Sequence, residues 1–338
     1  MKLDEALKRV AGGQRLDPQE SESVFLHALS AESDPVTLAG LLVALAQRGE
    51  DTGEILGAAR ALRARAVPFE HDHPDAIDTC GTGGDGLGTF NLSTASAIVA
   101  AAAGAKVIKH GNRSVSSSCG SADLLEAAGV ALELEPEAAR EVLDEVGITY
   151  LHAPKYHPAM RFAGPVRRSL GIPTIFNLLG PLANPGRVRR QVLGVAQSER
   201  LEAYGQLLKE LGHQRALVVH GGGGADELSL EAGNRVCLAG DMPDFPTDPA
   251  SLGLDQAPVS ALRGGDVAHN YGQLMRLLDG DGGPLRDALL YNSAAGLVVA
   301  GVEDTAEPAL RRAAESIDSG RAKARLVQWA ALSQAVQA

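Results

Sequence analysis

Residues 76–103 read AIDTCGTGGDGLGTFNLSTASAIVAAAA, and the succession of residue types in this stretch decides the predicted fold. It begins with a short run of strand type, continues through the glycine-rich segment Gly81–Gly86, and ends in the alanine-rich segment Thr94–Ala103, which is helical in composition. A strand, a glycine loop and a helix in this order are typical of α/β proteins, in which ligands bind at the carboxyl ends of parallel strands. We therefore predict an α/β fold with a binding site at this loop.

The rest of the chain continues this alternation of strand and helix. Strands are expected at Ala76–Thr79, Lys106–Lys109, Val192–Val195 and Ala216–His220, with helices such as Thr94–Ala103 and Arg200–Leu211 between them. The stretch Gly240–Pro258 is rich in Pro and Asp and is expected to be irregular. The pattern predicts one large α/β domain over residues 75–338 with a mostly parallel central sheet.

The start of the chain has a different pattern, that of short amphipathic helices. The first helix places Leu3 and Val10 on one face, and the aspartate–proline pairs at Asp17 and Asp34 are typical helix starts. We expect a helical domain over residues 1–70, joined by helices around 157–185. So small a unit cannot cover all its apolar faces internally, which predicts a homodimer formed through this domain.

Composition excludes some classes of function. The chain has 338 residues, 45% of them hydrophobic, and a formal net charge of −11, so a nucleic acid or an anionic membrane would be repelled over most of the surface. No stretch is long and apolar enough to span a membrane, and charged residues interrupt the start of the chain, where a signal peptide would be apolar. The three cysteines, Cys80, Cys119 and Cys237, fit neither a zinc cluster nor a disulfide framework. We expect a cytoplasmic protein with no nucleic acid and no membrane as partner.

The glycine-rich segment is open to more than one interpretation. Gly81, Gly83 and Gly86 fit the spacing of a dinucleotide-binding loop, but the next helix begins several residues later and no acidic residue follows at the distance that holds a ribose. The Gly-Lys-Ser/Thr ending of a P-loop is absent. A glycine turn without a ligand is a further alternative. The favoured interpretation is a loop whose backbone amides approach an anion.

The distribution of charge around the loop favours a phosphate ligand. From Leu87 to Ala122 there is no Asp or Glu. The side chains of this stretch that carry or can acquire positive charge are Lys106, Lys109, His110 and Arg113. The free amides and the positive dipole end at the start of the following helix also favour phosphate. A serine cluster at Ser114, Ser116 and Ser117 follows the next strand and adds further donors.

Three motifs resemble the signature of one enzyme family, and their order and spacing match it. They are Gly81-Thr82-Gly83-Gly84-Asp85, Asn91-Leu92-Ser93-Thr94 and Lys109-His110-Gly111-Asn112-Arg113. The family is that of anthranilate phosphoribosyltransferases, Mg²⁺-dependent pentosyltransferases of tryptophan biosynthesis. They join the amine of anthranilate to the ribose of phosphoribosyl pyrophosphate (PRPP) and release pyrophosphate. The resemblance covers Asp78 to Leu230 and implies a fold similar to nucleoside phosphorylases and phosphoribosyltransferases.

The resemblance also implies which residues bind PRPP. The residues at the matching positions are Gly81, Gly83, Gly84, Asp85, Thr89, Asn91, Ser93, Thr94, Lys109 and Ser121. No residue is identified as a general acid or base. Cys80 precedes the glycine loop, but no base is placed beside it and the chemistry needs no thiol, so it is interpreted as a small packed residue.

A second constellation, His157-Pro158-Ala159-Met160-Arg161 with Pro165-Val166-Arg167 and the run Phe176–Pro185, is similar to the same family and suits an aromatic acid. Arg167 can hold a carboxylate through two parallel hydrogen bonds. A solvated helix face is the alternative for these arginines, and it is preferred for Arg161 and Arg168. The residues implied to bind anthranilate are Gly81, His110, Asn112, His157, Arg167, Gly180 and Pro181.

The third constellation is a glycine run, Gly221–Gly224, followed by Asp226 and Glu227. Two adjacent carboxylates suit Mg²⁺, which prefers oxygen ligands and bridges substrate phosphates, although a capped surface turn would have the same appearance. The acidic metal pair of the family falls at these positions, so the resemblance implies a metal site of Ser93, Asp226 and Glu227. The glycine run here is longer than is usual for the family.

Two other functions are compatible with part of these motifs. A nucleoside phosphorylase or another transferase of this fold would keep the phosphate cradle but would need groups that recognise a base in place of Arg167. A nucleic-acid-binding relative without activity would have a basic surface and eroded acceptor motifs. The acidic chain with three intact constellations favours the transferase.

Overall fold

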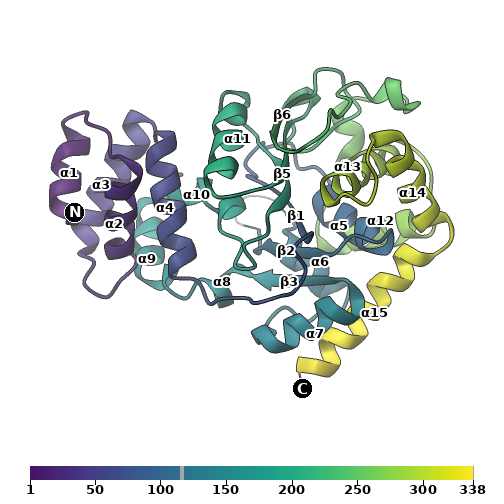
Figure 1. Ribbon diagram of the computed structural model, residues 1–338, viewed down its shortest axis with the longest axis horizontal. Coiled ribbons are helices and arrows are strands. Elements are labelled where there is room, and N and C mark those ends of the chain that lie inside the picture. The colour runs from purple at the N-terminus through teal and green to yellow at the C-terminus, as the bar shows by residue number, and fades with distance from the viewer. Residues whose placement is uncertain (115–117, 338) are drawn as a thin grey trace. The chain divides into compact units, whose positions relative to one another are not determined.

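The computed structural model describes residues 1–114 and 118–337, and the chain divides into two compact units (Figure 1). The helical unit consists of Met1–Pro68 and Ala153–Arg187. The α/β unit consists of Phe69–His152 and the chain from Val188 onward. Ser116 and Ser117, predicted above to add donors, lie outside the described residues.

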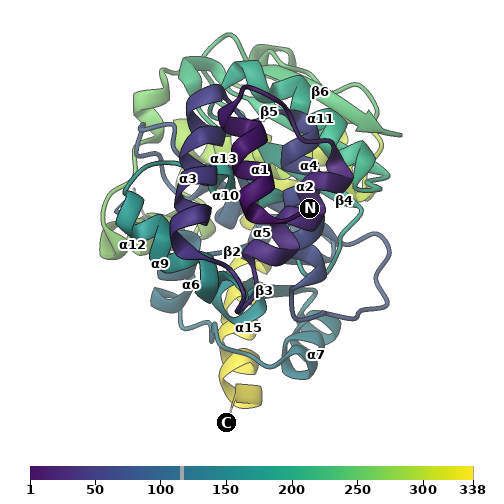
Figure 2. The same cartoon turned by 90° about the vertical axis from the view of Figure 1, so that its left-hand side faces the viewer.

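Helices make up the helical unit. Its elements are α1 (Leu3–Ala11), α2 (Pro18–Ala28), α3 (Pro35–Arg48), α4 (Thr52–Ala64), α8 (Ala153–Tyr156), α9 (Met160–Leu170), α10 (Ile175–Leu178) and the 3₁₀ turn η1 (Gly180–Leu182). Helix α1 lies against α3, and α2 lies against α4 (Figure 2). The guanidinium of Arg63 on α4 donates to the carbonyl of Leu182, and Phe25 meets Phe176 edge to face with ring centroids 5.6 Å apart. These contacts join the two chain segments of the unit.

The predicted helix starts are confirmed in this unit. The Asp17 carboxylate accepts the Glu20 amide at 2.8 Å, and the Asp34 carboxylate accepts the Thr37 amide at 2.8 Å. Each aspartate therefore satisfies an amide that has no partner within the helix, and the proline that follows needs none. Leucines at helical spacing on α3 are fully buried, so tertiary packing adds to these local signals.

One mixed sheet of six strands forms the centre of the α/β unit, in the order β3-β2-β1-β4-β5-β6. The strands are β1 (Ile77–Gly81), β2 (Val107–Gly111), β3 (Ile148–His152), β4 (Arg190–Gly194), β5 (Arg215–His220) and β6 (Arg235–Gly240). All neighbours are parallel except β5 and β6. The predicted fold class, a small helical domain with a larger, mostly parallel α/β domain, is confirmed.

The strand order creates a topological switch point. The chain proceeds from β1 toward β2 and β3 on one side and from β4 toward β5 and β6 on the other. In such sheets the crossover connections diverge at the switch point and leave a crevice at the carboxyl ends of the strands. Strands β1 and β4 end together, because Gly81 pairs with Gly194.

Helices and short turns connect the strands. The helices are α5 (Leu92–Ala102), α6 (Ser121–Ala127), α7 (Pro136–Val146), α11 (Leu201–Glu210), α12 (Val267–Leu278), α13 (Pro284–Ala300), α14 (Ala306–Asp318) and α15 (Arg321–Gln337). The 3₁₀ turns are η2 (Ser198–Arg200), η3 (Gly222–Gly224), η4 (Pro249–Leu252) and η5 (Val259–Leu262). Helix α5 is almost wholly buried and packs against β1 and α13. Residues 241–258 contain only η4, as expected of an irregular stretch. No described helix is long and apolar enough to cross a membrane.

The crossing of α2 and α4 generates a stability prediction. A Cβ atom on Gly57 of α4 would lie 2.5 Å from Ser21 Cβ and 2.6 Å from the Glu22 amide nitrogen, so Gly57→Ala requires the helices to separate. A Cβ atom on Gly272 of α12 would meet only the flexible end of Arg276, at 3.9 Å. We expect Gly57→Ala to cost about 1–3 kcal/mol of unfolding free energy and Gly272→Ala to be neutral or slightly stabilising. Thermal unfolding of both variants provides the test, and equal melting temperatures would contradict the close crossing.

Candidate active site

Asp226 and Glu227 cover three glycines at the carboxyl ends of β1, β4 and β5. The Asp226 side chain covers Gly81, and the backbone of the pair covers Gly194 and Gly221. A Cβ atom on Gly81 would lie 2.9 Å from Asp226 Cγ, and one on Gly194 would overlap the Asp226 carbonyl. A Cβ atom on Gly221 would overlap the Glu227 carbonyl. Any side chain at these positions would push the acidic pair away from the end of the sheet.

Main-chain amides hold the two carboxylates in place. The Gly83 amide donates to Asp226 Oδ2 at 2.7 Å, and the Ser93 amide donates to Glu227 Oε1 at 2.9 Å. The first bond joins Asp226 to the glycine loop, and the second joins Glu227 to the first turn of α5. The two acids are therefore fixed between the loop and the helix that follow β1.

Burial of these carboxylates opposes their ionisation. Desolvation and then the charge of Asp85 raise the pKa of Asp226 to about 6. Burial and the neighbouring Asp226 raise the pKa of Glu227 well above its ordinary value. Lys109 supplies a cation nearby, but burial lowers the pKa of this amine, and its ammonium donates to the Thr79 carbonyl.

The acidic pair has the chemistry of a divalent-cation site. Glu227 Oε2 is buried without a hydrogen-bond partner among the described residues, so one carboxylate oxygen remains available to a ligand. Among those residues no group of three or more His, Cys, Asp or Glu side chains is arranged to hold a metal ion by itself. The pair therefore fits Mg²⁺, which takes one or two carboxylates from a protein and its other ligands from water and substrate phosphates.

The glycine loop adopts a backbone conformation that other residues avoid. Gly83, Gly84 and Gly86 have φ values of 65°, 82° and 72°. The Asp85 carboxylate accepts the Leu87 amide at 3.1 Å, and Thr89 forms an antiparallel bridge with Arg263. The turn therefore contains three positions, two of them consecutive, where a side chain would be strained.

The start of α5 presents polar groups to this loop. Asn91 occupies the N-cap position without accepting a helix amide, and its side-chain nitrogen donates to the Cys119 carbonyl at 3.0 Å. The buried Thr94 hydroxyl has no hydrogen-bond partner among the described residues. The amides of the first turn of α5 already have acceptors, because Leu92 donates to the Phe90 carbonyl at 2.6 Å, Ser93 to Glu227 and Thr94 to the Asn91 carbonyl at 3.1 Å. The free amides expected at this helix start are therefore not found, and the side chains of Ser93 and Thr94 are what α5 offers to an anion.

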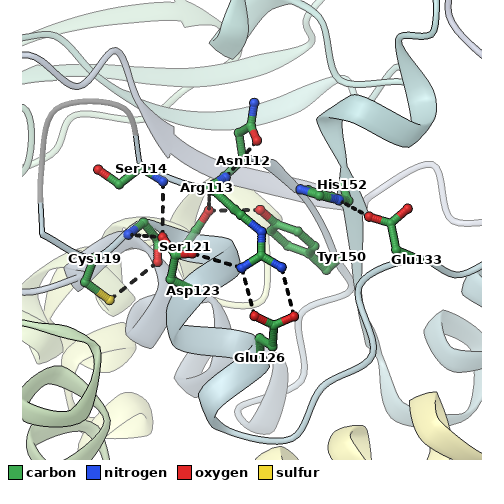
Figure 3. Close-up of polar contacts among 11 residues, drawn as sticks. Asn112, Arg113, Ser114, Cys119, Ser121, Asp123, Glu126, Glu133, Tyr150 and His152 are labelled. Atoms are coloured by element: carbon green, nitrogen blue, oxygen red, sulfur yellow. Dashed lines mark hydrogen bonds and ion pairs between the residues drawn. The ribbon is translucent and has the colours of Figure 1, made fainter.

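The chain after β2 folds back onto the start of α6 (Figure 3). The Ser121 hydroxyl lies 3.0 Å from the Tyr150 hydroxyl and donates to the Asn112 carbonyl at 3.3 Å. The Asn112 side-chain oxygen accepts the Arg113 amide at 2.7 Å. His110 is buried in β2, where its amide lies 3.4 Å from the Asp78 carboxylate. Ser121 and Asn112 are therefore neighbours.

Two cationic side chains of the acid-free stretch are engaged with other groups of the protein. Lys106 precedes β2 and therefore lies at the amino ends of the parallel strands, opposite to the glycine loop. Its ammonium donates to the carbonyls of Leu143 and Asp144 at the end of α7. The Arg113 guanidinium pairs with Asp123 at 3.0 Å and with Glu126 at 2.8 Å (Figure 3). Arg113 is thus neutralised by α6, whose acids begin just beyond the acid-free stretch.

The helical unit carries the other residues predicted for anthranilate. Arg167 on α9 lies with its guanidinium carbon 5.5 Å from the centre of the Phe176 ring and its Nη2 3.4 Å from Asn177 Oδ1. Burial lowers the pKa of Arg167. His157 is buried between α8 and α9, and burial lowers its pKa to about 4, so the imidazole is neutral. Gly180 and Pro181 form η1.

The cysteines show no sign of activation. Burial raises the pKa values of the thiols of Cys80, Cys119 and Cys237, which disfavours the thiolate. None of the three forms a disulfide. The sequence interpretation of Cys80 as a packed residue agrees with its position.

Some residues around the acidic pair were not predicted. Thr79, Gly194 and Asn292 line a cavity of about 20 Å³ together with Ser93, Asp226 and Glu227. The Asn292 side-chain oxygen accepts the Leu228 amide at 3.1 Å, and its nitrogen donates to the Leu228 carbonyl at 2.8 Å. Asn292 thus fixes the residue that follows the pair. No local motif marks an asparagine in the middle of α13 for such a role.

Comparison with known proteins places the chain in a family. Residues 4–66 match the model "Glycosyl transferase family, helical bundle domain", and residues 73–323 match "Glycosyl transferase family, a/b domain". An anthranilate phosphoribosyltransferase of Chloroflexus aurantiacus is 47% identical over 338 residues, which are 99% of each chain.

Solved structures agree. The anthranilate phosphoribosyltransferase of Thermus thermophilus is 44% identical, with a TM-score of 0.91 over 97% of this chain and 99% of that one. The enzyme of Saccharomyces cerevisiae, solved in complex with PRPP and Mg, is 26% identical, with a TM-score of 0.90 over 98% of both chains. The chain belongs to the family of anthranilate phosphoribosyltransferases.

Proposed function

We propose that this chain transfers the phosphoribosyl group of PRPP to the amine of anthranilate and releases pyrophosphate, a step of tryptophan biosynthesis. The observation that carries the proposal is the acidic pair Asp226 and Glu227, held by main-chain amides beside a glycine loop and a helix start. These parts suit a substrate with several phosphates and a divalent cation. Full-length relatives with this activity support the choice of substrates.

The acidic pair and Ser93 are the residues that would hold Mg²⁺. When bound, the cation neutralises charge that develops on the departing pyrophosphate. Asp226 and Glu227 supply the negative charge, and the Ser93 hydroxyl supplies an oxygen beside Glu227, to which its own amide is bonded. Burial raises the pKa values of the two carboxyls, which means that their ionised forms gain from an added positive charge.

PRPP is proposed to bind along the edge formed by the glycine loop and the start of α5. Its predicted ligands are Gly81, Gly83, Gly84, Asp85, Thr89, Asn91, Ser93, Thr94, Lys109 and Ser121, all of which belong to the α/β unit. Amides of the glycine loop and hydroxyls of the first turn of α5 can bind oxyanions without a basic side chain for each one. Such a site does not require Arg113.

Anthranilate is proposed to be held through its carboxylate by Arg167. A planar guanidinium matches a carboxylate with two parallel hydrogen bonds, and partial burial strengthens such a pair. His157, Gly180 and Pro181 of the helical unit, to which Arg167 belongs, are proposed as further contacts. The roles of Gly81, His110 and Asn112 stay expectations from the resemblance to the family. A nucleoside phosphorylase would require groups that recognise a base instead of this arginine.

The reaction is proposed to rest on positioning and electrostatic stabilisation. The amine attacks the anomeric carbon on the face opposite the pyrophosphate, so the C–N bond forms as the C–O bond breaks. The neutral His157 is buried among helices, and no described group is assigned as a base. The proton of the amine is proposed to pass to water or to the neighbouring carboxylate of anthranilate.

The proposed function is tested by mixing the purified protein with anthranilate, PRPP and Mg²⁺. Anthranilate fluorescence should fall with time, and the fall should require both PRPP and Mg²⁺. Constant fluorescence with a folded protein would reject the proposal and favour a binding protein.

Arg167→Ala should impair the use of anthranilate far more than that of PRPP, because only the acceptor carries the carboxylate. Hydrogen bonds to a charged group contribute about 1.5–3 kcal/mol, so kcat/KM for anthranilate should fall about tenfold or more. Arg167→Lys should restore part of the loss, and Arg168→Ala is the matched control on the same helix. A variant that loses affinity for PRPP and keeps its affinity for anthranilate would assign Arg167 to the phosphate site.

We further propose a homodimer formed through the helical unit, acting in the cytoplasm. Val36 and Val43, seven residues apart on one face of α3, are 80% and 40% exposed, and Ile172 is 45% exposed. A second copy of the chain would cover this apolar surface. Three thiols without disulfides suit a reducing compartment.

The dimer is tested by light scattering. The wild type should have twice the mass of one chain, and Val36→Asp with Val43→Asp should lower it to that of one chain, because two charges cannot be buried without partners. Val327→Asp on α15, at a valine 58% exposed, is the control and should leave the dimer intact. A wild type with the mass of one chain at every concentration would contradict the proposal.

A further inference from the structure

The segment of residues 262–270, which we call the strap, runs along the end of the glycine loop. The Phe90 amide donates to the Leu262 carbonyl at 2.8 Å, and the Gly264 amide donates to the Gly88 carbonyl at 2.9 Å. The bridge between Thr89 and Arg263 lies between these two bonds. The strap therefore acts as a short antiparallel partner for residues 88–90, although it is far from them in sequence.

The strap and the loop are closely packed. A Cβ atom on Gly264 would lie 3.0 Å from the Phe90 amide nitrogen and 3.0 Å from Asn270 Oδ1, so a larger residue would displace one of them. The Asp266 carboxylate then accepts the His269 amide at 2.8 Å and begins α12. This turn places Asn270 beside the start of α5.

Both polar atoms of the Asn270 side-chain amide form hydrogen bonds. Asn270 is 2% exposed, its Oδ1 accepts the Gly265 amide at 2.7 Å, and its Nδ2 donates to Asn91 Oδ1 at 2.9 Å. The Asn91 Nδ2 in turn donates to the Cys119 carbonyl at 3.0 Å. Three hydrogen bonds in series therefore link the strap, the N-cap of α5 and the residues just before α6.

This series fixes the orientation of Asn91. Because a main-chain donor occupies Asn270 Oδ1, only the amide nitrogen of Asn270 can face Asn91. Rotation of the Asn91 amide would set nitrogen against nitrogen on one side and oxygen against the Cys119 carbonyl on the other. Buried polar groups left unpaired in this way are costly, so a single orientation is strongly favoured.

We propose that Asn270 is a positioning residue for PRPP: it fixes the side chain of Asn91 and, through the Cys119 carbonyl, the approach to Ser121 at the start of α6. The proposal rests on the proposed function, because Asn91 and Ser121 are assigned there to PRPP. Binding then meets groups whose orientation is already set, so less ordering is needed when the substrate arrives. A purely structural alternative is that Asn270 serves only to close the turn at Gly265.

A double-mutant cycle separates these two roles. Asn270→Ala, Asn91→Ala and the double variant are compared with the wild type for the KM of PRPP, for kcat at saturating anthranilate and Mg²⁺, and for melting temperature. We expect Asn270→Ala to raise the KM of PRPP about three- to tenfold, with a smaller change in kcat. In the Asn91→Ala background the same substitution should change that KM less than about twofold, because the group through which it acts is gone.

The matched control is Ser333→Ala on α15, which also removes buried hydrogen bonds from the α/β unit. Ser333 is fully buried, and its hydroxyl accepts the Ala131 amide at 2.9 Å and donates to the Ala330 carbonyl at 3.0 Å. This variant should lower the melting temperature and leave the KM of PRPP unchanged. A KM shift as large as that of Asn270→Ala would make the effect a general loosening and overturn the proposal.

Other results would overturn either the positioning role of Asn270 or the proposed function. Additive losses in the double variant, or an unchanged KM of PRPP in a folded Asn270→Ala variant, would overturn the positioning role. If Asn270→Ala does not fold, Asn270→Ser takes its place in the cycle. A wild type that neither binds PRPP in a titration nor consumes anthranilate would instead refute the proposed function, so the two failures are distinguishable.

Discussion

The close approach of Asp226 and Glu227 to the ends of three neighbouring strands is the constraint on which the rest of the site depends. It is possible only because Gly81, Gly194 and Gly221 have no side chains. It brings the two carboxylates within hydrogen-bonding distance of the glycine loop and of the first turn of α5. The strand order supplies the crevice, and the glycines make room in it for an acidic segment.

This constraint has an electrostatic consequence. Burial, followed by the charge of Asp85 on Asp226 and that of Asp226 on Glu227, raises the pKa values of Asp226 and Glu227, so the protein alone disfavours their ionised forms. A divalent cation would relieve the repulsion and would be attracted for the same reason. The strap, which includes Asn270, holds the start of α5 in place, and Asn292 holds the residue after the acidic pair. These polar contacts are present before any ligand binds. Fixed polar groups of this kind are what electrostatic catalysis requires.

The sequence predicted the fold class, the strands β1, β2, β4 and β5 and the helix starts at Asp17 and Asp34, because these depend on neighbouring residues. The sequence did not reveal that Lys106 and Arg113 lie at opposite ends of one strand. Lys106 precedes the five-residue strand β2, and Arg113 follows it. Strands β3 and β6 were not among the strands expected. Strand β3 follows α7 with only Gly147 between them, and β6 is an edge strand that begins with the charged residue Arg235. The partners of Asn91 and of the three covered glycines lie far away in sequence, where no local pattern reveals them. The binding roles of individual residues stay proposals.

The assignment of Asp226 and Glu227 to Mg²⁺ is tested by the dependence of the rate on Mg²⁺ concentration in the double variant Asp226→Asn, Glu227→Gln. Amides keep the shape of the carboxylates but lose the charge that attracts the cation. We expect the Mg²⁺ concentration that gives half the maximal rate to rise about tenfold or more, while the melting temperature without Mg²⁺ is unchanged or higher because the buried repulsion is gone. A folded variant with the Mg²⁺ dependence of the wild type would contradict this assignment and place the metal elsewhere.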